Sequence, residues 1–145
     1  METATRVSVD RSKPRMAQQA RSRAVDSPYV RRVRQDVDAL RMLADNWDNE
    51  GAPRPSDDAL ERAQAVLRWV EEARLDSFNV TVEPDVLGGV GVMVRSRNDR
   101  GVWVACMNNG RDTVVFEDGS RITATPWTAA SKTAVVALLA GGSYQ

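Results

Sequence analysis

The sequence predicts an α+β domain in which two helices pack on an antiparallel sheet of about five strands, followed by a short C-terminal helix. Two observations carry this prediction. Apolar residues recur at three- and four-residue steps through residues 27–75 and alternate with polar residues from Phe78 onward. Turn-forming pairs such as Asp118-Gly119 then separate the alternating segments at short intervals, which is typical of a meander.

The first helix is predicted to begin at Ser27-Pro28, because serine is a good N-cap and proline suits the first helical position. Its apolar stripe is Val30, Val33, Val37, Leu40, Leu43, Ala44 and Trp47. We expect the helix to end near residues 47–49, since Asn49 tolerates the left-handed backbone of a helix exit. The prolines in segment 51–55 cannot continue a helix.

The second helix is predicted to begin after Ser56, a second good N-cap. Asp57 and Asp58 occupy its first turn, where the helix dipole favours negative charge. Its apolar stripe predicts an end near Arg74-Leu75.

Five strands are predicted, at residues 78–83, 90–94, 102–107, 113–117 and 121–125. The third is apolar on both faces, which is typical of a central strand. Val102, Val104 and Cys106 point to one face, and Trp103, Ala105 and Met107 point to the other. The helices can cover one face, so the other needs the C-terminal segment, the N-terminal arm or a partner.

The segment Ser131–Leu139 allows two interpretations. It can form a short helix capped by Ser131 and stopped by Gly141-Gly142, or a sixth strand because of its adjacent valines. Its alanines favour the helix.

Histidine is absent and Cys106 is the one cysteine, so Ser-His-Asp triads, histidine zinc sites and an internal disulfide are excluded. Cys106 lies in an apolar run, which favours a buried, unreactive thiol. The exclusion of an internal disulfide fits a cytoplasmic, reducing compartment. No apolar run approaches the roughly 18 residues of a membrane span. We therefore expect a protein that has no catalytic residues, cofactor or metal site and that does not bind membranes.

Residues 1–26 are predicted to be a flexible basic arm on a single domain, 27–145. Six cations against two carboxylates give residues 1–23 a net charge of +4, and large apolar groups are few, so ordering entropy is not offset. The cations are Arg6, Arg11, Lys13, Arg15, Arg21 and Arg23.

Residues 46–56 read Asn-Trp-Asp-Asn-Glu-Gly-Ala-Pro-Arg-Pro-Ser. This segment resembles the Asn-Trp-Asp-Gly-x-Gly-Ala-x-x-Pro-Ser link between two helices in small, largely uncharacterised bacterial and phage-borne proteins, in which a valine-rich meander follows. The resemblance covers roughly residues 40–118 and implies a shared fold without implying an activity. Asn49 stands where that pattern usually has glycine, and asparagine can also adopt the left-handed conformation.

The physical interpretation of this link is a structural loop. We expect Trp47 to anchor the helix end against the sheet and Asp48 to accept backbone N–H groups across the turn. The other residues assigned to the loop are Asn49, Gly51, Pro55 and Ser56.

A calcium loop is the alternative interpretation of this segment. Asn46, Asp48, Glu50, Gly51 and Asp57 match positions 1, 3, 5, 6 and 12 of an EF-hand frame. Glutamate at position 5, aspartate at position 12 and two prolines are poor matches to that oxygen cage, so we expect no metal.

The leading functional hypothesis is a non-catalytic protein-interaction module that acts by stoichiometric binding. It would be an inhibitor, antitoxin, immunity protein or assembly subunit of a bacterial or phage system. Trp103, Met107 and the arm cations are the residues predicted to contact the partner. Two alternatives remain, a nucleic-acid accessory protein that uses the arm and a hydrolase that uses magnesium or the carboxylates near the predicted turns. Those carboxylates are Asp85, Asp99, Asp112, Glu117 and Asp118.

Overall fold

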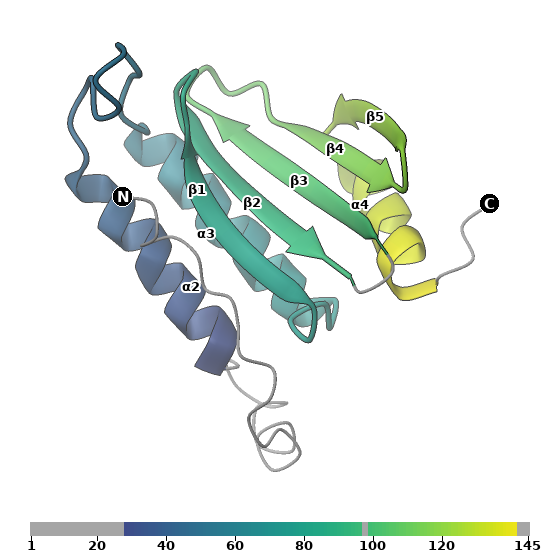
Figure 1. The fold of residues 1–145 in the computed structure, drawn as a ribbon. Helices are drawn as coiled ribbons and strands as arrows, with labels where there is room; N and C mark the ends of the chain where they lie inside the picture. The colour runs from purple at the N-terminus through teal and green to yellow at the C-terminus, as the bar shows by residue number, and fades with distance from the viewer. Residues whose placement is uncertain (1–27, 97–98, 142–145) are drawn as a thin grey trace.

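Short turns connect five strands into an antiparallel meander with the order β1-β2-β3-β4-β5 (Figure 1). The computed structural model describes residues 28–96 and 99–141. The strands are β1 (Asn79–Asp85), β2 (Gly89–Arg95), β3 (Arg100–Met107), β4 (Thr113–Asp118) and β5 (Arg121–Pro126). The α+β class, the antiparallel sheet and the central position of the third strand are confirmed.

The helical elements are α2 (Pro28–Ala39), η2 (Leu40–Met42), α3 (Asp57–Glu72), α4 (Ala129–Val136) and the π-helical η3 (Ala137–Gly141). In Figure 1 α3 and α4 lie behind the sheet, and α2 lies beside α3. α3 contacts β2 and β3, whereas α2 contacts β1. The second helix therefore covers the middle of the sheet, and the first helix covers its β1 side.

Valines form most of the sheet side of the core. Strand alternation turns eight of them toward the helices, and each is at most 2% exposed. They are Val80, Val82, Val90, Val92, Val94, Val102, Val104 and Val114. Val33 and Val37 from α2 and Leu60 and Leu67 from α3 meet them. Burial of each such side chain stabilises the fold by roughly 1.5–3 kcal/mol before entropy is counted.

The first helix is shorter than predicted, because it ends at Met42 and not near Trp47. Leu43 adopts an extended backbone with φ −73° and ψ 147°. Leu43 still packs against the core, so its helical spacing reflected burial and not continued helix. Asp45 and Asp48 accept backbone N–H groups of the following loop, which competes with helix formation.

The second helix begins as predicted. The Ser56 hydroxyl accepts a hydrogen bond from the Ala59 N–H at 3.1 Å, and Asp57 and Asp58 lie in the first turn. The helix ends at Glu72, slightly before the predicted position, and Arg74 leaves it with φ 61°.

The C-terminal segment is a helix, as its alanines predicted, but its cap is Thr128 and not Ser131. Ser131 is the third helical residue and forms a capping box with Thr128, so each side chain bonds the other's backbone. Val135, Leu138 and Leu139 join the core between the helices and the sheet. The C-terminal segment therefore covers the same face as α3 and leaves the Trp103 face without it.

Candidate functional site

The segment between η2 and α3 is a loop closed by its own side chains. Asn46, Asn49 and Gly51 have positive φ angles of 68°, 65° and 90°, so the left-handed backbone predicted for Asn49 is confirmed, but it lies inside the loop and not at a helix exit. Asp48 Oδ1 accepts backbone N–H groups of Glu50 (2.9 Å) and Ala52 (3.0 Å), also as predicted. These N–H groups, that of Ala52 first, hold the pKa of Asp48 below its usual range.

Trp47 does not anchor a helix end against the sheet, so that prediction is wrong. The helix has already ended at Met42, which places Trp47 inside the loop. Its indole Nε1 donates to the Pro53 carbonyl at 3.0 Å, and the side chain is not part of the core cluster. Trp47 therefore closes the loop on itself.

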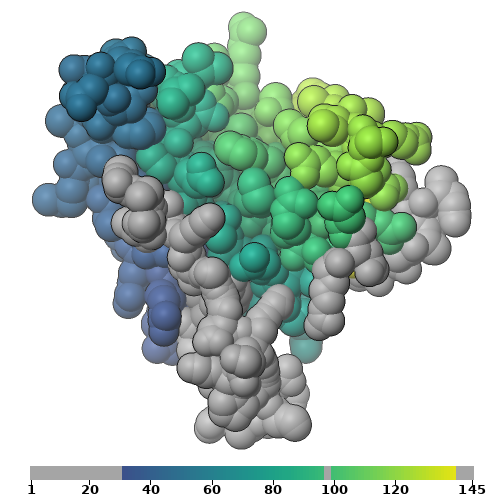
Figure 2. Space-filling view, viewed as in Figure 1, coloured from purple at the N-terminus to yellow at the C-terminus, as the bar shows by residue number. Residues whose placement is uncertain are grey.

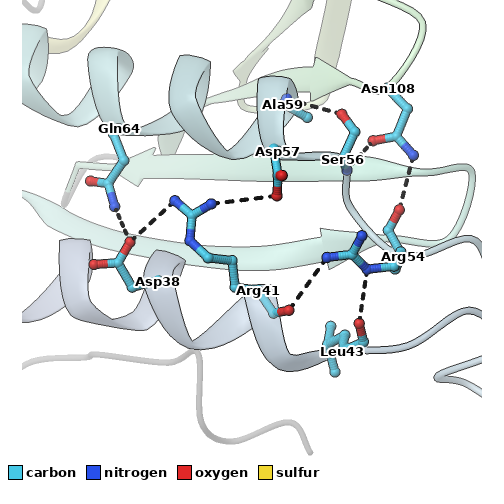
Figure 3. A network of polar contacts seen from close by, with 9 residues as sticks. All are labelled: Asp38, Arg41, Leu43, Arg54, Ser56, Asp57, Ala59, Gln64 and Asn108. Atoms are coloured by element: carbon cyan, nitrogen blue, oxygen red, sulfur yellow. Dashed lines mark hydrogen bonds and ion pairs between the residues drawn. The ribbon is translucent and has the colours of Figure 1, made fainter.

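Two side chains that sequence reasoning missed attach the loop to the rest of the fold (Figure 3). Arg54 donates to the carbonyls of Leu43 (Nε, 3.1 Å) and Arg41 (Nη2, 3.4 Å), which completes the end of η2. Asn108, from the β3–β4 turn, accepts from the Ser56 N–H at 2.7 Å and donates to the Arg54 carbonyl at 3.0 Å. Asn108 lies more than 50 positions away in sequence, so no local pattern could identify it.

Three side chains of the calcium alternative already have protein partners. Asn46 Oδ1 accepts from the Gly51 N–H at 2.7 Å, and Asp48 Oδ1 holds two N–H groups. Asp57 forms an ion pair with Arg41 at 3.5 Å. Within residues 28–96 and 99–141 no three acidic, cysteine or histidine side chains gather as a metal site would need. These contacts favour the structural interpretation of the loop. Pro55, which is buried, and Ser56 belong to the same loop.

The carboxylates near the turns serve separate structural contacts. Asp85 accepts the Leu87 N–H at 2.8 Å within its own turn. The others, Asp99 apart, form ion pairs: Asp112 with Arg62 (2.7 Å), Glu117 with Arg95 (2.6 Å) and Asp118 with Arg100 (3.2 Å). Each of these three carboxylates pairs with a different arginine.

The Arg62–Asp112 pair connects α3 to the end of the central strand. Arg62 holds both carboxylate oxygens, at 2.7 and 3.3 Å, and also donates to the Met107 carbonyl at 2.6 Å. The Met107 N–H donates back to Asp112 at 2.9 Å. Cys106 lies beside this pair, fully buried, and burial first, then the Asp112 charge, raises the pKa of its thiol to about 12. The predicted burial of Cys106 is confirmed, and a protonated thiol is a poor nucleophile.

The sheet face opposite the helices carries a mostly apolar row across all five strands. Register places Thr81, Met93, Trp103, Val115 and Ala124 side by side, and all except the exposed Ala124 are half-buried. We call this surface the open face. The viewer looks onto it in Figure 1, and Figure 2 shows it from the same side, with the teal and green side chains of β2 to β4 at the surface.

Trp103 lies at the centre of the open face, and Gly91 makes room for its ring. A Cβ atom on Gly91 would come within 2.5 Å of the indole Nε1, so the indole rests directly on the β2 backbone. No atom of residues 28–96 and 99–141 accepts a hydrogen bond from that nitrogen. Tryptophan with an available N–H is enriched at protein interfaces, because it combines a large apolar surface with one polar group.

The rows beside the tryptophan differ in character. On one side Arg95 reaches across Gly101 to Glu117, forming a 2.6 Å ion pair over the sheet. On the other side lie Gly91, which has no side chain, and the small Ala105, with the exposed Glu83 of β1 in the same row and Met107 one step further along β3. The open face is therefore apolar in the middle, with small residues and Glu83 on one side and the Arg95–Glu117 ion pair on the other.

Of the residues predicted to contact a partner, the structure places Trp103 and Met107 on the same face. The six cations of residues 1–26 lie outside the described residues. Within the described part of the chain, no helix has both the length and the apolar composition needed to cross a membrane.

Comparison of this chain with protein-family models, with curated proteins and with solved structures found no match.

Proposed function

We propose that this protein is a non-catalytic interaction module that binds one partner protein stoichiometrically through the open face. The observation that carries the proposal is Trp103, a half-buried tryptophan at the centre of a sheet face that the described helices leave uncovered. Binding energy at interfaces concentrates in a few central residues, and tryptophan is the type most enriched among them. The roles consistent with such binding are inhibitor, antitoxin, immunity protein or assembly subunit of a bacterial or phage system.

The chemistry of the described residues supports binding over turnover. Four of the five carboxylates near the turns are used in ion pairs and a turn cap, and the one thiol is buried with a raised pKa. The single cysteine also supports action in a reducing compartment such as the cytoplasm. Beside Trp103, Arg95 and Glu117 are paired with each other, and Glu83 adds a negative charge at the β1 edge, so the partner surface should be mainly apolar with a polar rim.

The test compares capture by three forms of the full chain in extracts of the native host. Trp103→Arg removes the central apolar group, and Met42→Arg is the matched control because Met42 is 83% exposed and belongs to η2, outside the open face. The wild type and Met42→Arg should retain the same protein, and Trp103→Arg should bind it at least 30-fold more weakly, the factor of a hot-spot residue.

The captured protein is then purified and mixed with each form at known concentration. A saturable complex of integer stoichiometry, formed by the wild type and the control, supports the proposal. Recovery of the bare chain from the host, or equal binding by Trp103→Arg with an unchanged circular dichroism spectrum, would count against it.

The second candidate is a nucleic-acid accessory function, favoured by the net charge of +4 in residues 1–23. It predicts binding that weakens steeply with salt, because cations release the counterions of phosphates. Binding of a DNA or RNA oligonucleotide should vanish when residues 1–26 are deleted and should be unchanged in Trp103→Arg, which separates the two candidates.

A further inference from the structure

The last strand of the sheet is uncovered on both faces. All six residues of β5 are exposed, including Arg121, Thr123 and Thr125, whose side chains point to the helix side. Ile122, on the open face, is 64% exposed. β5 therefore extends beyond the helical layer, as the curled strand at the edge of the sheet in Figure 1 illustrates.

The outer edge of β5 presents a defined set of backbone groups. The N–H of Trp127 donates to the Asp112 carbonyl at 3.1 Å. In an antiparallel ladder every second residue of a strand is hydrogen-bonded to a given neighbour, so the odd-numbered residues of β5 bond to β4. Ile122 and Ala124 therefore direct an N–H and a carbonyl outward, and Pro126 directs a carbonyl alone. Within residues 28–96 and 99–141 no strand pairs with this edge.

The two edges of the sheet differ in how they discourage strand pairing. The edge strand β1 carries Glu83, Pro84 and Asp85, and charge and proline are the usual protections of an exposed edge. In β5 the stretch from Ile122 to Thr125 has neither. β5 is the edge open to another strand.

We propose that β5 pairs with β5 of a second copy of this chain, antiparallel about a twofold axis at Thr123, and joins two sheets into one. In this register Ile122 faces the partner's Ala124, and Ala124 faces the partner's Ile122. The four outward N–H groups then meet four outward carbonyls. A register centred on Ala124 would instead place Ile122 opposite the partner's Pro126, and each of those two pairs would have one hydrogen bond in place of two, because proline has no N–H.

The side chains fit the same register. Each Ile122 packs beside the partner's Ala124 on the open face, and Thr123 lies opposite the partner's Thr123, a favourable cross-strand pair. Arg121 lies opposite the partner's Thr125, so the only charged residue of β5 meets no like charge across the pair. This self-complementarity favours a second copy over an unrelated strand as the occupant.

The interface has a limited area. Six residues from each copy cannot bury the roughly 1,600 Å² of a standard interface, so the dimer should be weak and reversible. This inference is independent of the proposed function, because the open face can bind its partner with or without strand pairing.

Sedimentation of the full chain from about 10 μM to 1 mM tests the proposal. The average mass should rise from the 16.0 kDa of the monomer toward twice that value. Ala124→Pro removes one outward N–H and should keep the chain monomeric. Ile122→Lys should also keep the chain monomeric, because it places a positive charge on each of the two paired strands. It provides a second variant if the proline impairs folding. Val86→Lys is the matched control, because Val86 is 57% exposed in the β1–β2 turn and its variant should dimerise like the wild type.

Amide hydrogen exchange gives a readout specific to the edge. The amides of Ile122 and Ala124 should exchange more slowly as concentration rises, whereas those of Thr123 and Thr125, already bonded to β4, should not change. Three outcomes would overturn the proposal: a mass of 16.0 kDa at every concentration, a dimer that still forms in both β5 variants, or amide exchange rates at Ile122 and Ala124 that do not change with concentration.

Discussion

Replacing Gly91 with alanine should destabilise the wild-type protein and stabilise a variant in which Trp103 is already alanine. The new Cβ would lie 2.5 Å from the Trp103 Nε1 and 2.7 and 2.8 Å from Cε2 and Cζ2. Comfortable contacts lie at ~3.5–4 Å, so the ring must move by about 1 Å. Because the indole is half-exposed, it can move at a cost of about 1–2 kcal/mol, at the low end for overpacking.

The backbone term has the opposite sign. Glycine in a strand is less stable than alanine by roughly 0.5–1 kcal/mol, because it loses more conformational entropy on folding. In the wild type the clash outweighs this gain, whereas in Trp103→Ala only the gain remains. The two substitutions should therefore couple by the clash term alone, about 1–2 kcal/mol, within the range measured for residues in contact.

Urea unfolding followed by far-ultraviolet circular dichroism measures the free energy of unfolding for the wild type, the two single variants and the double variant. Gly101→Ala is the control, because a Cβ there meets Val94 and Arg95 at 3.3–3.5 Å and not the indole. It should couple to Trp103→Ala by less than about 0.5 kcal/mol. Additive effects of Gly91→Ala and Trp103→Ala would refute the placement of the indole on the β2 backbone.

Three further predictions concern the contacts that hold the fold. Ser56→Ala removes the N-cap of α3 and should lower the free energy of unfolding by about 1 kcal/mol in urea titrations, and Ser56→Asp should retain most of the stability. Asp112→Ala removes the acceptor of the Arg62 bonds and of the Met107 N–H, and should cost about 2–3 kcal/mol; a loss below 0.5 kcal/mol would show that the pair contributes little. The thiol of Cys106 should react with iodoacetamide at pH 8 far more slowly in native protein than in urea, because its pKa is about 12. Because the pKa of this thiol is raised in the native state, its contribution to the free energy of unfolding is complete below the ordinary thiol pKa near 9. As the pH rises from 9 toward 12, the unfolded chain loses the thiol proton and the native protein keeps it, so the free energy of unfolding falls by at most about 1.4 kcal/mol per pH unit. Cys106→Ala should lack this part of the pH dependence.

The elements found correctly from sequence are those whose signals are local. The α3 helix carries its cap, its first-turn charges and its stripe within consecutive residues. The strands carry alternating valines, and the short turns between them leave little freedom in pairing order. The prediction of where the first helix ends was wrong, because Leu43 and Trp47 have helical spacing for other reasons. Leu43 packs against the core, and Trp47 closes a loop.

The sequence predicted which residues share the face of the candidate site, but not which face of the sheet would be exposed. Alternation in β3 places Trp103 and Met107 on one face whatever the tertiary structure. Gly91 as the support of the indole could not be identified, because it depends on the register between β2 and β3 and on the direction in which the ring leans.

The sequence alone determined the α+β class, the meander and the two sets of side chains on the central strand, because these follow from periodicity and turn chemistry within a few residues. The tertiary structure decided which set is buried, since α4 packs on the same side as α3 and leaves the Trp103 side open. It also decided the contacts of Asn108 with the helix link and of Arg62 with Asp112, which join residues about 50 positions apart. Such contacts depend on how whole elements pack, and no local pattern encodes that packing.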